Sequence, residues 1–234
     1  MSDVEGLKRE AGITACSFVR SGMKLGLGTG STVKYTIIEI GRMISEEGMD
    51  VVGVPTSEST RELAESLGIP LMSISEAESL DLTIDGADEF DPNFSLIKGG
   101  GGALTREKEV ALISDSMIVV ADDRKKVPVL GKFDLPIEVD QELWSGVSEA
   151  IRLSSGVEST LRGGGESPYV TDNGGFILDC KFGPTIVDPA NLEAQILSIG
   201  GVVQVGLFVD LCDAVVMSTE SGVEVIINPV GRLP

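Results

Sequence analysis

Hydrophobic and polar positions up to about residue 128 alternate between amphipathic stretches and short apolar runs. This alternation is typical of βαβ units, in which helices connect the parallel strands of one sheet and pack against it. We expect helices at 5–20, 32–46, 58–67 and 104–113, and strands at 25–28, 51–54, 82–85 and 117–121. The fold class predicted from this pattern is α/β, with a Rossmann-like and mostly parallel sheet.

The pattern changes between Pro128 and Pro136, where a short connection precedes a second series of elements. We expect strands at 135–139, 157–161, 175–180 and 202–207, with helices at 142–154 and 189–199. The order strand, helix, strand, strand, helix, strand is close to a split βαβ arrangement and predicts an inserted, small α+β domain of ferredoxin-like type. The strand-like segments 212–217 and 223–227 flank a Ser-Gly turn, and we expect them to return to the first sheet.

These elements divide the chain into a Rossmann-like domain at 1–130 and 208–234 and a small α+β domain at 131–207.

Composition excludes several classes of function. The formal net charge of −19 disfavours nucleic acid and anionic membrane as partners, because both bind clusters of Lys and Arg. No apolar run reaches the ~18 residues that span a bilayer, and the acidic start MSDVEGLKRE is unlike a signal peptide, so we expect a cytoplasmic protein. Three distant cysteines without a CxxC pair encode neither a disulfide framework nor a zinc site, and we expect buried free thiols. Because histidine is absent, any proton transfer must use Asp, Glu, Lys, Tyr or Cys.

The segment GLGTGST at 26–32 lies between a predicted strand and a predicted helix. Its glycines allow backbone N–H groups to approach an anion at the start of the helix. A dinucleotide fingerprint would need glycine in place of Ser31 and an acid after the next strand, and a Walker loop would need lysine in place of Gly30. Two interpretations remain: a monophosphate cradle with the hydroxyls of Thr29, Ser31 and Thr32, or an ordinary turn capped by Ser31 or Thr32.

Four ionisable residues occur in a pattern that suits proton transfer next to a carbonyl. Asp85 and Asp88 lie at the carboxyl end of the strand 82–85, where open α/β sheets bind ligands. Lys98 precedes four glycines, and Glu107 lies in the helix that follows them. An aldose-ketose isomerisation needs a base, which Glu107 supplies if burial raises its pKa from about 4.3, and a cation such as Lys98 for the oxyanion. We then expect Asp85 and Asp88 to position sugar hydroxyls or relay protons.

Each of these residues also has a purely structural interpretation. Glu107, within REKE, is compatible with a solvated helix face, and Lys98 with a surface lysine. Asp85 and Asp88 are compatible with turn formers or, together with Asp91, with ligands of a divalent cation, although DGADEFDPN lacks the spacing of a calcium loop.

Cations cluster in one part of this acidic chain. Seven of its 18 Lys and Arg lie between 98 and 132: Lys98, Arg106, Lys108, Arg124, Lys125, Lys126 and Lys132. Such a cluster would attract an anionic substrate that the global charge repels, although basic loops also balance neighbouring acids.

Five motifs occur in the same order as in one known family: GLGTGST, DGADEFD, KGGGGALTREK, KVPVLGKF and TDNGGFILD. The chain resembles ribose-5-phosphate isomerase of type A over nearly its whole length. The resemblance implies interconversion of D-ribose 5-phosphate and D-ribulose 5-phosphate through a cis-enediolate, without metal or cofactor, in a homodimer or homotetramer. It implies Glu107 as general base, Lys98 as the oxyanion-binding lysine, and Asp85 and Asp88 as acids near C1 and C2 of the sugar. Substrate contacts are implied for Thr29, Gly30, Ser31, Thr32, Lys98, Gly99, Gly100, Lys125 and Lys8.

Two other classes of protein are compatible with this fold. Sugar-phosphate-sensing domains of transcription regulators share it, but we expect them to lack counterparts of Glu107 and Lys98, and no helix-turn-helix segment precedes residue 24. Amino-sugar phosphate deaminases and isomerases normally use a histidine, which is absent here. The prediction from the sequence is therefore a sugar-phosphate isomerase.

Overall fold

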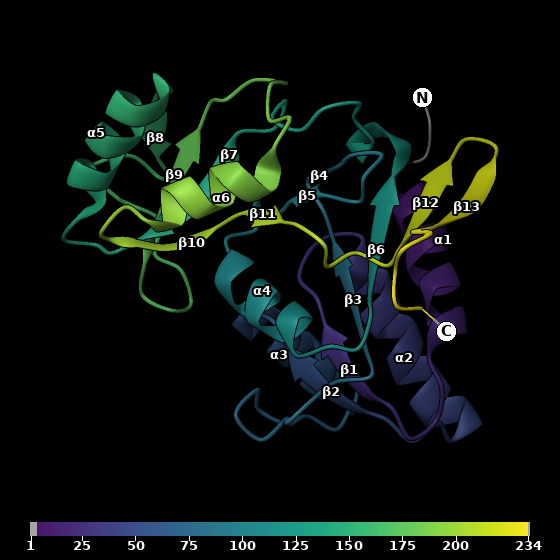
Figure 1. Ribbon diagram of the computed structural model, residues 1–234. Coiled ribbons are helices and arrows are strands. Elements are labelled where there is room, and N and C mark those ends of the chain that lie inside the picture. Colours follow the sequence, from purple (N-terminus) through teal and green to yellow (C-terminus); the bar gives the residue numbers. More distant parts are fainter. Residues whose placement is uncertain (1–3, 234) are drawn as a thin grey trace. The chain divides into compact units, whose positions relative to one another are not determined.

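The computed structural model describes residues 4–233, which form two compact units (Figure 1). Unit 1 takes the chain up to Ala87, the segment Arg106–Lys125, and the chain from Leu211 onward. Unit 2 takes Asp88–Thr105 and Lys126–Asp210.

Unit 1 is built on a six-stranded sheet in the order β13-β12-β6-β3-β1-β2. Its strands are β1 (Lys24–Leu27), β2 (Val52–Pro55), β3 (Leu82–Gly86), β6 (Met117–Asp122), β12 (Ala214–Thr219) and β13 (Gly222–Ile227). All neighbours are parallel except the edge strand β13, which is antiparallel to β12. The chain runs from β1 out to β2 and then back across β1 to β3, so the strand order reverses between β1 and β3. In open α/β sheets ligands bind beyond the carboxyl ends of the strands at such a reversal.

Helices α1 (Val4–Ala15), α2 (Val33–Glu47), α3 (Glu58–Ser66) and α4 (Leu104–Leu112) accompany the strands. The apolar stripes of α1 and α2 pack with side chains of β1, β3, β6 and β12 in one core cluster. The expected helix over 5–20 is shorter, because Ala15 ends α1 and the 3-10 turn η1 (Cys16–Phe18) leads into extended Val19. The other helices and strands expected for this part of the chain are confirmed to within two residues, including the return of β12 and β13.

Unit 2 contains a four-stranded antiparallel sheet in the order β10-β7-β9-β8. Its elements are β7 (Leu135–Val139), α5 (Trp144–Ser155), β8 (Ser159–Leu161), β9 (Phe176–Cys180), α6 (Pro189–Leu197) and β10 (Val202–Val205). This order and connectivity are those of a split βαβ arrangement, which confirms the ferredoxin-like expectation. All three cysteines of the chain are free and buried, as expected.

A second, three-stranded sheet in unit 2 was not predicted. It pairs β11 (Leu207–Phe208), β5 (Leu96–Ile97) and β4 (Glu89–Phe90), which are too short to show an apolar period. Its pairing assigns the segment 88–105 to unit 2, whereas the sequence placed it in the larger domain. The domain boundaries at 131 and 207 stay a prediction.

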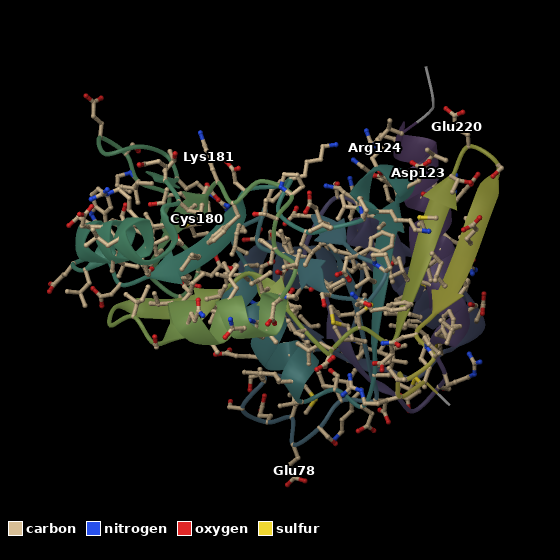
Figure 2. The ribbon with its side chains drawn as sticks, turned by 45° about the horizontal axis from the view of Figure 1, so that its top comes forward. Glu78, Asp123, Arg124, Cys180, Lys181 and Glu220 are labelled. Carbon is tan, nitrogen blue, oxygen red and sulfur yellow. The ribbon has the colours of Figure 1, made fainter. Side chains whose placement is uncertain are left out.

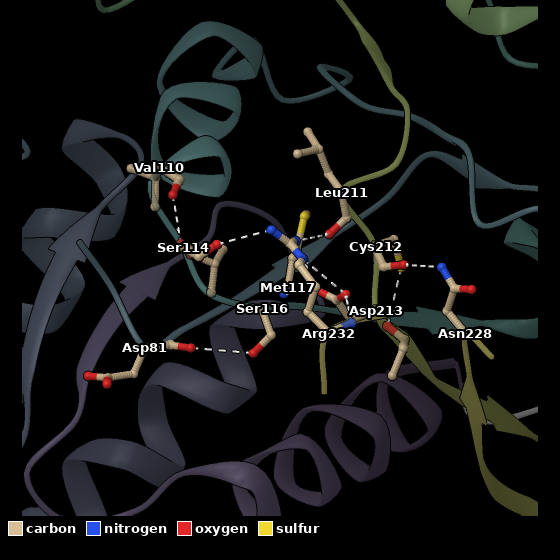
Figure 3. A network of polar contacts seen from close by, with 12 residues as sticks. Asp81, Val110, Ser114, Ser116, Met117, Leu211, Cys212, Asp213, Asn228 and Arg232 are labelled. Carbon is tan, nitrogen blue, oxygen red and sulfur yellow. Dashed lines mark hydrogen bonds and ion pairs between the residues drawn. The ribbon is translucent and has the colours of Figure 1, made fainter. Parts of the chain in front are cut away.

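The end of the chain is fastened to unit 1 by the buried carboxylate of Asp213 (Figure 3). Its Oδ1 accepts a hydrogen bond from the backbone N–H of Arg232 at 2.6 Å, and its Oδ2 accepts one from Met117 N at 2.7 Å. The Arg232 guanidinium also contacts Oδ2 at 3.0 Å and donates to the carbonyl oxygens of Leu211 and Ser114 at 3.1 and 3.3 Å. One ion pair therefore ties the C-terminal residues to the starts of β6 and β12.

We predict that Arg232→Ala lowers the free energy of unfolding by about 1–3 kcal/mol, because it leaves a buried carboxylate without its charged partner. Urea denaturation measures this change. Arg152→Ala is the matched control: Arg152 makes a similar pair with Glu149 on α5, but both side chains are about half exposed, at 46% and 54%. A loss no larger than that of the control would contradict the fastening role of Arg232.

Candidate active site

The loop between β1 and α2 passes very close to β3. The N–H of Gly28 donates to the carbonyl oxygen of Ile84 at 3.0 Å. A Cβ added at Gly28 would lie 2.2 Å from Asp85 Oδ1 and 2.5 Å from Asp85 Cα. Only glycine fits this approach, which lies where the strand order of unit 1 reverses.

Asp85 connects this loop to the end of β3. Its side chain is fully buried, and its Oδ1 accepts hydrogen bonds from Thr29 N at 3.0 Å and Gly86 N at 2.7 Å. Two backbone donors therefore fix one oxygen of this carboxylate. Asp85 is therefore held in place by the loop between β1 and α2, for which the sequence left two interpretations, a phosphate cradle and an ordinary capped turn.

The hydroxyl of Thr29 belongs to a cluster that the sequence analysis missed. Its Oγ1 lies 2.7 Å from Thr56 Oγ1, 2.8 Å from Ser57 Oγ and 3.1 Å from Thr60 Oγ1. Thr60 in turn donates to the carbonyl oxygen of Gly28 at 2.9 Å, and Ser57 caps α3. The run TSEST after β2 was the available signal, because hydroxyls that follow a strand in a parallel sheet lie beside those of the neighbouring loop. Thr29 thus fastens the loop between β1 and α2 to α3.

Ser31 and Thr32 lie at the start of α2, and the capping interpretation is wrong for Thr32. Thr32 occupies the N-cap position without a side-chain hydrogen bond to the helix. Gly30 and Ser31 are exposed, and Gly30 adopts a φ of 137°, which favours glycine. Uncapped N–H groups and the positive end of the helix dipole favour an anion at this position.

Glu107 is buried on α4, with 4% of its surface exposed. The interpretation of Glu107 as part of a solvated helix face is therefore wrong. Its neighbour Glu109 is the exposed acid of this turn. Burial of a carboxylate is costly without specific interactions, so it indicates a requirement other than packing.

Lys98 is buried in unit 2, with 2% of its surface exposed, and the surface-lysine interpretation is wrong. Its Nζ lies 5.3 Å from the centroid of the Phe208 ring, within range of a cation–π contact. Its backbone N–H donates to Gly206 O at 2.8 Å. The main chain of Lys98, directly after β5, is therefore tied to the residue that precedes β11.

Asp88 holds the glycine loop that follows Lys98. Its Oδ2 accepts a hydrogen bond from Gly100 N at 2.7 Å, and a Cβ at Gly100 would lie 2.5 Å from its Oδ1. The loop closes on itself through Gly102 N and Gly99 O at 2.9 Å. The carboxylate thus orders the loop, and its expected contact with the sugar stays a prediction.

The remaining acids of DGADEFD have structural partners. Asp91 Oδ1 accepts hydrogen bonds from Asn93 N and Ser95 N, both at 2.9 Å, so Asp91 is a turn former. Glu89 accepts hydrogen bonds from Gly131 N and Phe133 N at 2.8 and 2.6 Å, so its carboxylate holds the backbone of the KVPVLGKF segment in place. Among residues 4–233, no group of three or more Cys, Asp or Glu side chains is arranged to hold a metal ion.

Lys8 and Lys125, two lysines predicted to contact the substrate, both lie in unit 1. Lys8 on α1 pairs with Glu5 Oε1 at 2.8 Å and lowers the pKa of that carboxyl. Lys125 ends the short helix η2 (Asp123–Lys125) after β6. The preceding Arg124, beside Asp123 in Figure 2, contacts Asp122 at 2.7 Å and lowers the pKa of the Asp122 carboxyl by its hydrogen bonds. Lys8 and Lys125 remain predicted phosphate-side lysines.

Unit 1 also contains a cleft of about 500 Å³ lined by residues of β2, α3, α4 and the segment 71–76. Glu58, which lines the cleft, pairs with Arg61 and with Arg106, and these hydrogen bonds, chiefly that from Arg106, lower the pKa of the Glu58 carboxyl. None of the predicted site residues lines this cleft.

The fold and its buried ionisable groups define the class of protein. A carboxylate and an ammonium group are expensive to bury, and apolar residues would stabilise the same packing better. Their retention on an α/β fold with glycine loops indicates an enzyme. Within the described chain, moreover, no helix has the length and hydrophobicity to span a membrane.

Comparison with known proteins identifies the family. The model of the family described as Ribose 5-phosphate isomerase A (phosphoriboisomerase A) matches residues 52–222. This chain therefore belongs to the ribose 5-phosphate isomerase A family.

Individual relatives agree over nearly their whole lengths. The ribose-5-phosphate isomerase A of Bacillus mycoides (strain KBAB4) is 46% identical over 218 residues, which are 93% of this chain and 98% of the relative. The solved structure of ribose 5-phosphate isomerase A from Methanocaldococcus jannaschii has a TM-score of 0.90 at 39% identity and covers 95% of this chain and 99% of its own. A D-ribose-5-phosphate isomerase in complex with phospho-erythronic acid has a TM-score of 0.93 at 40% identity, with 97% and 100% covered.

We predict that Gly28→Ala lowers the free energy of unfolding by about 1–3 kcal/mol and reduces turnover, because the new methyl group overlaps Asp85. Chemical denaturation and a steady-state assay measure the two effects. Gly146→Ala on α5 is the matched control, since its Cβ meets nothing within 4 Å and alanine favours a helix. Equal behaviour of the two variants would show that the loop tolerates a wider spacing from β3.

Proposed function

We propose that this protein interconverts D-ribose 5-phosphate and D-ribulose 5-phosphate, with Glu107 as the general base. The observation that carries the proposal is the burial of both Glu107 and Lys98 in a chain of this family. A sugar-phosphate sensor needs neither a base nor an oxyanion donor, and binding alone would not offset the cost of burying them. The enzyme is therefore favoured over the sensor.

The proposed reaction moves one proton between two carbons. Glu107 takes the proton from C2 of the open-chain aldose, and the electron pair of the broken C–H bond forms the C1–C2 double bond of an enediolate. Lys98 stabilises the negative charge that develops on O1. Glu107 then returns the proton to C1, while the hydroxyl proton on O2 is removed and O1 is protonated. We assign the transfer between the two oxygens to Asp85 and Asp88.

The phosphate is proposed to bind at the loop Gly30–Thr32. The exposed loop, the uncapped start of α2 and the unused capping capacity of Thr32 support this assignment. Thr29 contributes by fastening the loop, because its hydroxyl is shared with Thr56, Ser57 and Thr60. Lys8 and Lys125 are proposed as phosphate-side cations, and Gly99 and Gly100 as backbone contacts to the sugar.

We propose a cytoplasmic homodimer or homotetramer that works without metal or cofactor and binds neither nucleic acid nor membrane. The net charge of −19 supports the last two points, since both surfaces are anionic.

The purified protein, treated with EDTA, is expected to form ribulose 5-phosphate from ribose 5-phosphate. In D2O, deuterium should accumulate at C1 of the ketose and, by reversal, at C2 of the aldose, because a carboxyl proton exchanges with solvent. Mass spectrometry of the sugars measures this incorporation. Complete retention of protium after many turnovers would contradict a carboxylate base. Thermal stabilisation by the sugar phosphate without turnover would instead indicate a sensor.

Glu107→Gln should lower kcat by about 10³-fold or more while KM stays within a few-fold, because only the transition-state proton transfer is removed. Glu109→Gln, two residues along the same helix, is the matched control, since its side chain is exposed. The control should retain normal turnover. Near-normal kcat in Glu107→Gln would remove Glu107 from the mechanism.

A further inference from the structure

Two side chains of unit 2 contact the carbonyl groups of the glycine loop. Arg162, directly after β8, donates through Nη1 to Gly99 O at 2.9 Å and to Gly100 O at 3.2 Å. Tyr169 donates through its hydroxyl to Gly101 O at 3.4 Å. Three consecutive carbonyl oxygens of the loop are therefore turned toward the connection between β8 and β9.

Arg162 is itself oriented by an acid on β9. Its Nε donates to Asp179 Oδ2 at 3.0 Å, and its Nη2 donates to Asp179 Oδ1 at 2.5 Å. Its guanidinium also lies 5.9 Å from the centroid of the Tyr169 ring. A guanidinium can bind a carboxylate with one edge and two carbonyl groups with its remaining nitrogen, whereas an ammonium cannot hold this geometry.

The peptide between Gly99 and Gly100 lies between two charges. Its carbonyl oxygen accepts a hydrogen bond from the Arg162 guanidinium, and its N–H donates to Asp88 Oδ2 at 2.7 Å. A trans peptide directs these two groups to opposite sides, so the arginine and the aspartate fix one peptide plane from both sides. Four successive glycines lose more conformational entropy on ordering than other residues, and this loop therefore needs such external contacts.

We propose that Arg162, oriented by Asp179 and assisted by Tyr169, is a positioning residue of the isomerase reaction. It keeps the glycine loop in one conformation, so that Lys98 and the loop meet the substrate without reordering at each turnover. This inference rests on the proposed role of Lys98. The expected consequence is kinetic, because displacement of a binding group by about 1 Å can reduce the rate by about 100-fold.

The simpler alternative is an ion pair that only stabilises unit 2. A matched control exists in the same unit: Arg152 and Glu149 on α5 form a pair of similar geometry through Nε and Nη2, at 2.8 and 2.6 Å. Arg152 contacts no part of the glycine loop among the hydrogen bonds of the described chain. Comparison of the two arginines therefore separates loop positioning from ion-pair stability.

The test compares Arg162→Ala, Arg162→Lys and Arg152→Ala by kcat, KM, melting temperature and hydrogen–deuterium exchange of the peptide covering 98–104. We expect Arg162→Ala to lower kcat/KM by about 10–100-fold and to speed exchange in the loop, and Arg162→Lys to recover only part of both. Arg152→Ala should leave the kinetics and the loop exchange unchanged. If Arg162→Ala does not fold, Tyr169→Phe and Asp179→Asn test the same contacts, with a smaller loss expected for Tyr169→Phe.

Unchanged loop exchange in Arg162→Ala, or faster exchange with normal kinetics, would overturn the inference. A loss of stability equal to that of Arg152→Ala, with kcat and KM unchanged, would do the same. Lys98→Met tests the underlying assignment separately. Normal turnover in Lys98→Met would remove the proposed role of Lys98, whereas loop exchange in Arg162→Ala would still report whether Arg162 orders the loop.

Discussion

The close approach of Gly28 to Asp85 is the constraint on which the arrangement of unit 1 depends. Because no side chain separates the first loop from β3, the Asp85 carboxylate reaches the backbone N–H of Thr29 directly. The same approach directs the Thr29 hydroxyl toward Thr56, Ser57 and Thr60. Adjacent carboxyl ends of three strands, β1, β2 and β3, are thus joined by short polar contacts, while Gly30 and Ser31 in the rest of the loop stay exposed.

A second constraint acts in unit 2, where flexibility of the chain is countered by charge. The glycine loop lacks side chains with which to pack, so its conformation depends on groups brought by other elements. Asp88 holds its N–H side and Arg162 its carbonyl side. Four successive glycines leave the main chain of this loop bare, and its order is recovered from these two charges.

Local pattern predicted most of the fold and the identities of the central ionisable residues, but not their surroundings. Helices and strands of four or more residues are long enough for a repeating pattern of apolar and polar positions to be recognised. β4, β5 and β11 have two residues each and were missed. Glu107 and Lys98 were identified from the motif KGGGGALTREK. The same motif is also compatible with surface positions for both side chains, because their burial depends on segments distant in the sequence. Arg162 gave no local signal at all, since its partners lie 62 and 63 positions earlier and 17 positions later in the chain.

The Asp213–Arg232 pair lies in a part of unit 1 that is synthesised after unit 2. Unit 2 ends at Asp210, so all of its residues have been synthesised before β12, β13 and the tail emerge. Unit 1 needs those last residues to supply two strands of its sheet and the cation for Asp213. Until β12 has been synthesised, β6 therefore lacks one of its two neighbours in the parallel sheet.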